Sequence, residues 1–225
     1  MKTYLISITS DCEGLKENYI DTIHKIKDSA EPIMVSFLPQ PPQVDFQVIP
    51  VGCPYPGNLN RFDYFPKGFD DYDMIIFTDA SDVIFQKEIP PLEEKIYVSQ
   101  EYDVWGADNW WKDKIELYKL DKLIGFPIYC MGTWAMPYID VKDLLNFINT
   151  NRGLCGNSQF SDQILFNLWL QGKDYSHRTD LFGSLYSGFE KKNITKTKKG
   201  FVNKSRQIIS IVHANGGTKD LLIKK

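Results

Sequence analysis

Cysteine is scarce in this chain of 225 residues, which contains four: Cys12, Cys53, Cys130 and Cys155. They lie far apart, and no two of them form a C-x-x-C pair, which argues against a structural zinc site. They are also too few and too scattered for a disulfide scaffold. We therefore expect reduced thiols and a cytoplasmic protein.

Long apolar runs and a strong charge of either sign are also missing. Residues 1–9 are too polar and too short for the apolar region of a signal peptide, and no later run approaches membrane-spanning length. The formal net charge of −3 indicates neither a nucleic acid nor an acidic membrane as partner of the chain as a whole. Because we find no internal repeat and no domain boundary, we expect one domain covering residues 1–225.

The first fifty residues alternate between strand and helix patterns. Residues 4–9, 33–38 and 46–51 have the composition and alternation of strands. Residues 16–27 place apolar side chains at helical spacing. A strand, a helix and a strand in this order favour a right-handed parallel unit. We therefore predict an α/β fold with a mostly parallel central sheet flanked by helices.

Further elements are predicted along the rest of the chain. Residues 52–67 are rich in proline, glycine and aromatic residues, which predicts a long functional loop or a short irregular helix. The remaining patterns predict helices beginning at Pro90 and covering 141–148 and 164–170, and strands at 103–108, 126–137 and 207–212.

The most informative stretch is D-M-I-I-F-T-D-A-S-D-V-I-F at residues 73–85. The five uncharged residues between Asp73 and Asp79 predict a strand buried on both faces, as central parallel strands are. Residues three apart on a continuing strand point to opposite faces, so Asp79 and Asp82 can share a ligand only if the chain bends at Ala80–Ser81, and we predict that bend. Such strand ends bind ligands in open α/β sheets, and carboxylate oxygens suit Mg²⁺ or Mn²⁺. The alternative is a strand end capped by solvated acids.

A second polar cluster follows the last predicted strand, where His213 precedes Asn215, Gly216 and Lys219. Two acids at one strand end and a histidine at another could complete a metal site with open positions. Glycine amides and a lysine suit an anionic ligand. A metal and a lysine beside a diphosphate stabilise the charge that builds up when a nucleoside diphosphate departs. These residues therefore point to glycosyl transfer from a sugar nucleotide.

Three other features each allow two interpretations. The adjacent indoles of Trp110 and Trp111, in a predicted polar loop at 109–113, either fill the core or form a stacking face for a sugar or a base. Asp162 lies on the first turn of a helix that Ser161 is predicted to cap, where it either satisfies the helix dipole or faces a substrate hydroxyl. The basic run 191–206 is either a solvated loop or a phosphate-contacting surface.

The order of these segments resembles the GT-A glycosyltransferase domain at the amino end of the procollagen lysyl hydroxylases, together with the related small viral and bacterial glycosyltransferases. Residues 76–85, I-F-T-D-A-S-D-V-I-F, are similar to the strand and metal motif of that family. Residues 211–219, I-V-H-A-N-G-G-T-K, are similar to its H-x-N-G-x-T-K segment. Residues 105–108 and 161–163 lie where the family has equivalents, and the resemblance runs over almost the whole chain.

The resemblance implies a single GT-A, Rossmann-like domain that binds a UDP-sugar with Mn²⁺ or Mg²⁺ as the cofactor. By this resemblance, Asp79, Asp82 and His213 would hold the metal against the diphosphate, and Asp162 would face the acceptor or the reacting sugar. The residues expected to contact the diphosphate are Asn215, Gly216, Lys219 and, as a candidate cation, Arg61. The candidates for the acceptor or sugar pocket are Trp110, Trp111, Asp108 and Gln163.

The leading hypothesis is a metal-dependent glycosyltransferase that moves a sugar from a UDP-sugar to an acceptor hydroxyl. The acceptor could be a glycan, a protein side chain or a hydroxymethylated base in DNA, and the last would give the basic run a purpose in phosphate contact. Retention and inversion both stay open, and inversion would use Asp162 as the base. The alternatives are a phosphohydrolase or nucleotidyltransferase that uses two metals, and a nucleotide-sugar binding module without activity.

Overall fold

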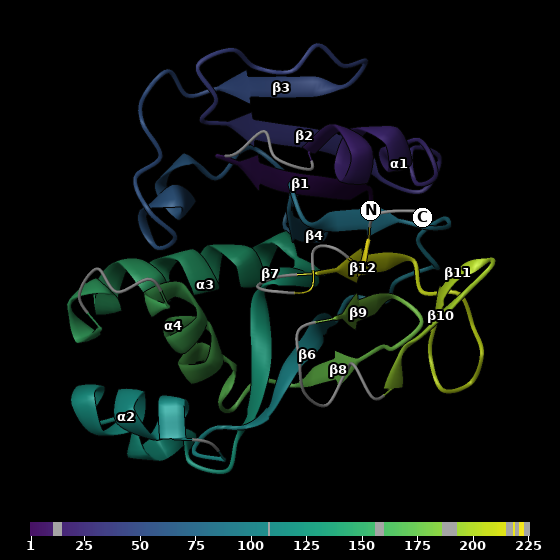
Figure 1. Ribbon diagram of the computed structural model, residues 1–225. Helices are drawn as coiled ribbons and strands as arrows, with labels where there is room; N and C mark the ends of the chain where they lie inside the picture. The colour runs from purple at the N-terminus through teal and green to yellow at the C-terminus, as the bar shows by residue number, and fades with distance from the viewer. Residues whose placement is uncertain are drawn as a thin grey trace.

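A computed structural model describes residues 1–10, 15–107, 109–155, 160–185, 193–214, 218 and 221–222. Within these ranges, the side chains of residues 102, 103, 109 and 110 are not described. The described residues form a seven-stranded central sheet, a three-stranded sheet and a two-stranded hairpin, and the helices pack around the central sheet (Figure 1).

The central sheet has the strand order β3-β2-β1-β4-β7-β6-β8. Its strands are β1 (Thr3–Thr9), β2 (Glu31–Ser36), β3 (Gln47–Pro50), β4 (Met74–Asp79), β6 (Ile96–Val104), β7 (Pro127–Pro137) and β8 (Tyr175–His177). Strands β1 to β4 pair in parallel, and β7 runs antiparallel to both β4 and β6. Strands β6 and β8 again pair in parallel. The predicted α/β fold with a mostly parallel central sheet is therefore confirmed.

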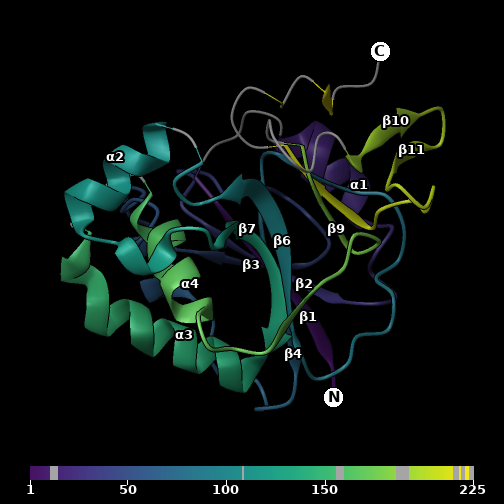
Figure 2. The ribbon, with the colours of Figure 1, turned by 90° about the horizontal axis from the view of Figure 1, so that it is seen from below.

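Both faces of the central sheet are covered (Figure 2). One face carries α2 (Asn109–Tyr118), α3 (Tyr138–Asn151) and α4 (Ser161–Leu170). The other carries the π-helix η1 (Leu15–Ile20), α1 (Asp21–Ile23) and the three-stranded sheet of β5 (Val83–Phe85), β12 (Ile211–His213) and β9 (Phe182–Ser184). The remaining elements are the 3₁₀ helices η2 (Asn60–Tyr64), η3 (Asp121–Leu123) and η4 (Arg152–Leu154), and the hairpin of β10 (Thr195–Thr197) and β11 (Gly200–Val202).

Strand β4 is buried on both faces, as its sequence predicts. Ile75 and Phe77 belong to the core shared with α3 and α4, whereas Met74 and Ile76 belong to the core shared with η1, α1 and the three-stranded sheet. Trp134 of β7 stacks on Phe77, with 5.1 Å between the ring centroids. This double burial fixes β4, and the polar residues that follow it therefore project from a rigid sheet.

The helix predicted to begin at Pro90 is wrong, because residues 86–95 form neither helix nor strand. The backbone groups of this segment are used in tertiary contacts. Gln86 N donates to Ser210 O, and Ile89 N donates to Ser29 Oγ, both at 2.9 Å. These tertiary hydrogen bonds satisfy backbone groups that a helix would otherwise have paired internally.

Three other predictions differ from the structure in extent or type. The strand predicted at 103–108 already begins at Ile96 and ends at Val104, since the chain turns at Gly106, whose φ is +85°. The strand predicted at 207–212 is reduced to β12. The polar loop predicted at 109–113 is the start of α2. The strand at 126–137, the helix at 141–148 and the short irregular helix within 52–67 are confirmed as β7, α3 and η2.

Candidate functional site

The bend predicted after the acidic strand is present. Strand β4 ends at Asp79, residues 80–82 form a bend and a turn, and β5 begins at Val83. Strand β12 pairs antiparallel with β5, so that His213 lies opposite Val83, and Ala214 N donates to Asp82 O at 2.8 Å. This register brings a histidine from the far end of the sequence beside the two acids.

Asp79, Asp82 and His213 converge on one point. His213 Nε2 lies 3.3 Å from Asp82 Oδ1 and 3.7 Å from Asp79 Oδ2. One ligand atom from each residue lies within 4.8 Å of the other two. Asp82 and His213 are buried, whereas Asp79 is half-buried and is the accessible member of the group. Two carboxylates and an imidazole at this spacing could hold a divalent metal ion.

The backbone of β7 packs against this group at Gly132. A Cβ atom at Gly132 would collide with Asp79 Oδ2 and would lie 2.7 Å from His213 Cε1. Neither neighbour is the far end of a long flexible side chain, so the collision could not be relieved cheaply. Glycine is needed at this position for room.

The imidazole of His213 is oriented through its second nitrogen. Nδ1 lies 3.0 Å from Thr133 Oγ1 and 3.4 Å from Cys130 Sγ, both on β7. A metal-binding histidine commonly donates its other ring N–H to such a partner, which fixes the tautomer and the ring plane. Burial by itself lowers the pKa of His213, but Asp82 and Cys130 together act in the opposite direction, and the pKa lies well above its ordinary value.

Cys130 is an uncharged thiol, so it is neither an activated nucleophile nor a thiolate ligand for a metal. Burial raises the pKa of the Cys130 thiol to about 12, and the carboxylate of Glu101 acts in the same direction. The thiol is therefore protonated at neutral pH. Glu101 is buried on β6 and was not predicted as part of the site. Its place in the largely uncharged strand pattern of 96–104 is only a weak signal, because that pattern also contains Asp103.

Arg61, on η2, joins Asp79 to Asp162. Its guanidinium donates from Nη1 to Asp79 Oδ1 at 2.6 Å and from Nη2 to Asp162 Oδ2 at 3.2 Å. The group is buried and lies over the rings of Phe62 and Phe77, at 5.2 and 5.5 Å from their centroids. Burial opposes the charge, but Asp79 and Asp162 raise the pKa of Arg61 above its ordinary value. Arg61 therefore remains a cation between two carboxylates.

Asp162 lies on the first turn of α4, as predicted. The helix begins at Ser161 itself, so the predicted cap is wrong by one residue. Asp162 Oδ1 accepts a hydrogen bond from Gln163 N at 2.8 Å. Burial raises the pKa of Asp162, although the charge of Arg61 acts in the opposite direction. A buried carboxyl with a raised pKa beside a cluster of charged groups is a candidate for proton transfer.

Two buried asparagines hold the elements of the site together, and neither was predicted from the sequence. Asn18 on η1 donates from Nδ2 to Ser81 O at 2.9 Å, inside the turn that follows β4. Asn167 on α4 accepts from Tyr129 N and donates to Tyr129 O, each at 2.8 Å, which links α4 to β7. Asn167 interrupts an apolar helical run, and that interruption is the signal that could have identified it. Asn18 follows Lys16 and Glu17 in a polar stretch, which carries no such signal.

Trp111 is part of the core, so its assignment to an acceptor or sugar pocket is wrong. Its ring centroid lies 4.2 Å from that of Trp105 and 6.3 Å from that of Phe160, and it is buried in the cluster under α3 and α4.

The other candidates for the acceptor or sugar pocket are described only in part. Gln163 is half-buried next to Asp162. Five predicted site residues lie outside the described part of the chain, wholly or in their side chains: Asp108, Trp110, Asn215, Gly216 and Lys219.

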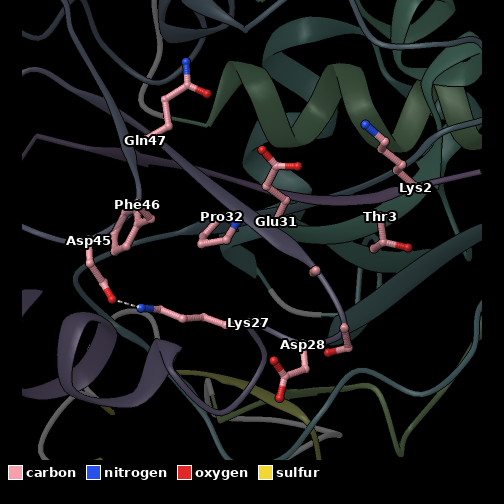
Figure 3. A pocket seen from close by; sticks show the side chains of 11 residues that line it. Lys2, Thr3, Lys27, Asp28, Glu31, Pro32, Asp45, Phe46 and Gln47 are labelled. Carbon is pink, nitrogen blue, oxygen red and sulfur yellow. Dashed lines mark hydrogen bonds and ion pairs between the residues drawn. The ribbon is translucent and has the colours of Figure 1, made fainter.

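A separate cavity of about 610 Å³ lies at the other end of the central sheet (Figure 3). Residues at the beginnings of β1, β2 and β3 line it, and Lys27 and Asp45 form an ion pair on its wall. Open α/β sheets bind ligands at the carboxyl ends of their strands, and this cavity faces the amino ends. Its position and mixed charge make it a poorer candidate than the group around Asp79.

No known protein family matches the chain, and a search of curated proteins finds no match either. Among the described residues, every helix is too short or too polar to span a lipid bilayer. A functional assignment therefore depends on the chemistry of the site itself.

Proposed function

We propose that the chain is a glycosyltransferase of the GT-A type, which uses a divalent metal ion to move a sugar from a UDP-sugar to an acceptor hydroxyl. The observation that carries this proposal is the convergence of Asp79, Asp82 and His213 beside Arg61 and Asp162. The group lies at the carboxyl end of β4 in a mostly parallel sheet, where open α/β sheets bind ligands.

The donor set fits Mn²⁺ or Mg²⁺. Asp79, Asp82 and His213 would hold the ion, and three protein ligands leave positions open for oxygen atoms of a substrate. When bound, a divalent ion neutralises charge that develops on a departing diphosphate. Asn215, Gly216 and Lys219 remain the proposed diphosphate contacts of the protein, because glycine amides and a lysine suit an anion.

In this proposal Arg61 is the residue that prepares Asp79 for its ligand role. Because the guanidinium binds Oδ1 of Asp79, the Oδ2 atom is left to face His213. Thr133 holds Nδ1 of His213 in a similar way, which leaves Nε2 directed at the carboxylates. Both ligands are thus oriented before a metal arrives, and such preorganisation strengthens binding by reducing the ordering cost.

Asp162 is proposed to act on the acceptor side. Its raised pKa makes the carboxylate a stronger base than that of an exposed aspartate. In an inverting reaction, Asp162 would accept the proton of the incoming hydroxyl. In a retaining reaction, it would orient the hydroxyl or the sugar beside the leaving diphosphate. The acceptor classes remain a glycan, a protein side chain and a hydroxymethylated DNA base, and an acceptor screen separates them.

Calorimetry tests the proposal in two steps. UDP is titrated into the protein with and without Mn²⁺, and UDP-sugars then replace UDP in the absence of an acceptor. We expect UDP binding that depends on Mn²⁺, followed by slow hydrolysis of one UDP-sugar. Failure of UDP to bind contradicts the proposal. Equal UDP affinity with and without Mn²⁺ contradicts it too. Metal-dependent binding without hydrolysis of any UDP-sugar indicates a nucleotide-sugar binding module.

A phosphohydrolase or nucleotidyltransferase with two metals is the competing enzyme class. Such sites hold two ions about 3.5–4 Å apart, which requires further carboxylates between them. Within the described residues, Asp79, Asp82 and His213 form the one group of three or more candidate ligands. Hydrolysis of p-nitrophenyl phosphate with Mn²⁺, in a protein that leaves every UDP-sugar intact, would favour this class.

A further inference from the structure

The hairpin of β10 and β11 carries an excess of positive charge. The sequence contains no aspartate or glutamate between residues 191 and 219. The cations of the same segment are Lys191, Lys192, Lys196, Lys198, Lys199, Lys204, Arg206 and Lys219. In a chain whose formal net charge is −3, this is a strong local imbalance. Such imbalances attract partners of the opposite charge.

The surface of the hairpin is hollowed. A cavity of about 910 Å³ is lined by residues between 193 and 208, and Lys198, Lys199, Lys204 and Arg206 are the cations among them. All four are exposed. Lys196 is already engaged, because its Nζ donates to a backbone carbonyl at 2.7 Å. We call the cavity and its four cations the basic hairpin surface.

Gln86 anchors the basic hairpin surface to the rest of the molecule. Its Nε2 donates to Phe201 O at 3.1 Å and to Ile209 O at 2.8 Å, and its Oε1 accepts from Phe201 N at 2.7 Å. Gly200, with a φ of +121°, lies so close that a Cβ there would collide with Gln86 Oε1. Phe201 and Ile209 share a small core with Val212 of β12, beside which the hairpin lies (Figure 1). The cations are therefore presented by a fixed part of the fold.

The backbone at Arg206 forms a constrained turn. Its φ of +59° lies in the left-handed region, which is uncommon for a residue other than glycine. Asn203 holds this turn: its carbonyl accepts from Arg206 N at 2.9 Å, and its Oδ1 accepts from Gln207 N at 2.9 Å. A left-handed residue persists where its surroundings determine it, and such positions cluster at binding sites.

We propose that the basic hairpin surface binds the phosphate backbone of a nucleic acid strand. Several cations around one hollow match a polymer with repeated phosphates, since each contacted phosphate adds to the affinity by releasing counterions. The large apolar residues at this surface are buried (Phe201 and Val202) or half-buried (Ile208), so its described part offers no exposed wedge for insertion into a lipid bilayer. This binding goes beyond glycosyl transfer and does not require the metal site.

Fluorescence anisotropy with a labelled single-stranded DNA of about 20 nucleotides tests the proposal, because single-strand sites cover roughly 4–16 nucleotides. The whole chain is compared with the double variant Lys198→Glu/Lys199→Glu. The control is Lys67→Glu/Lys122→Glu, which makes the same change in net charge at exposed lysines elsewhere. Salt is varied between about 50 and 200 mM.

We expect the hairpin variant to bind DNA at least about tenfold more weakly than the control. The slope of log affinity against log salt should fall by about 1.4, because each neutralised phosphate of a single strand contributes roughly 0.7. If the variant does not fold, Lys204→Gln/Arg206→Asn replaces it, since asparagine tolerates a left-handed backbone. The same loss is expected there.

Equal DNA affinity of the hairpin variant and the control would overturn the proposal. Salt-independent binding by the unchanged chain would overturn it too, as would a preference for phosphatidylserine vesicles over DNA. Mn²⁺-dependent UDP binding is measured on the same samples and should be unchanged in the hairpin variant. That readout keeps a failure of nucleic acid binding separate from a failure of the proposed glycosyl transfer.

Discussion

At the scale of single residues, the candidate site depends on one close approach. Gly132 does not have a left-handed backbone, so its conformation does not require glycine. Glycine is required because Asp79 Oδ2 and His213 Cε1 lie where a Cβ atom would stand. The side chains delivered by β4 and β12 can meet over β7 only with a hydrogen atom at that position.

Gly132→Ala is expected to abolish Mn²⁺-dependent UDP binding in a chain that still folds. Overpacking of this kind costs about 1–3 kcal/mol, and it can be relieved only by moving two of the candidate metal ligands. Gly153→Ala is the matched control, because a Cβ at Gly153 meets nothing within 4 Å. Calorimetry and thermal melting compare the two variants. UDP binding as tight as that of the control would show that Gly132 is not packed against the ligands.

At the scale of elements, η1 and α1 hold the turn between β4 and β5 and the end of β5. Asn18 Nδ2 donates to Ser81 O at 2.9 Å within the turn. One helical turn later, Thr22 Oγ1 accepts from Phe85 N at 3.0 Å on β5. π-Helical turns are frequent at functional sites, and η1 places its one buried amide against the segment that carries both acids.

Asn18→Ala is expected to weaken Mn²⁺-dependent UDP binding by about tenfold, the lower end of the loss seen when outer-shell partners of a metal site are removed. The free energy of unfolding should fall by about 1 kcal/mol, because the partly buried carbonyl of Ser81 loses its donor. Asn146→Ala, on the exposed side of α3, is the control. Calorimetry and urea unfolding measure both effects. An unchanged metal dependence in Asn18→Ala would mean that the turn holds its shape without η1.

Elements with strong local patterns could be predicted from the sequence, and elements decided by tertiary contacts could not. Strand β4 and its bend follow from an apolar run that ends on acids. Residues 86–95 looked like a helix start, but their backbone groups bond to distant partners such as Ser210 and Ser29. For Trp111 the sequence left core packing and a stacking face open, and the structure places it edge-on against Trp105 in the core. Local hydrophobic periodicity could not decide either case.

At the scale of the whole molecule, the site is where distant parts of the chain meet. The convergence of Asp79, Asp82 and His213 could be predicted, because their residue types and strand-end positions already suit a metal. The bridge made by Arg61 could not be predicted in this form. It joins Asp79, 18 positions away, to Asp162, 101 positions away, and it depends on where η2 lies between β4 and α4. A sequence pattern identifies a cation near the site but not the partners it takes.

Arg61→Gln is therefore expected to destabilise the molecule as well as its site. Removing the cation leaves Asp79 Oδ1 and Asp162 Oδ2 without the guanidinium that binds them, and breaking a buried ion pair costs about 3–5 kcal/mol. Arg61→Lys should fall between Arg61→Gln and the unchanged chain, because a single ammonium cannot bridge two carboxylates with the fork of a guanidinium. Urea unfolding without metal measures these differences, and calorimetry measures the loss of Mn²⁺-dependent UDP binding.

The control for Arg61 is Arg152→Gln, because Arg152 pairs with Asp63 at the surface and also binds the amide oxygens of Asn60 and Asn149. Surface ion pairs contribute about 0–1 kcal/mol, so this variant should lose much less stability than Arg61→Gln. If Arg61→Gln were no less stable than Arg152→Gln, the bridge would not hold η2, β4 and α4 together. If Arg61→Gln lost stability but kept its full affinity for UDP and Mn²⁺, Arg61 would be a structural link alone. A joint loss, with Arg61→Lys intermediate in both measurements, is the outcome expected of a residue that positions a metal ligand while it connects three elements.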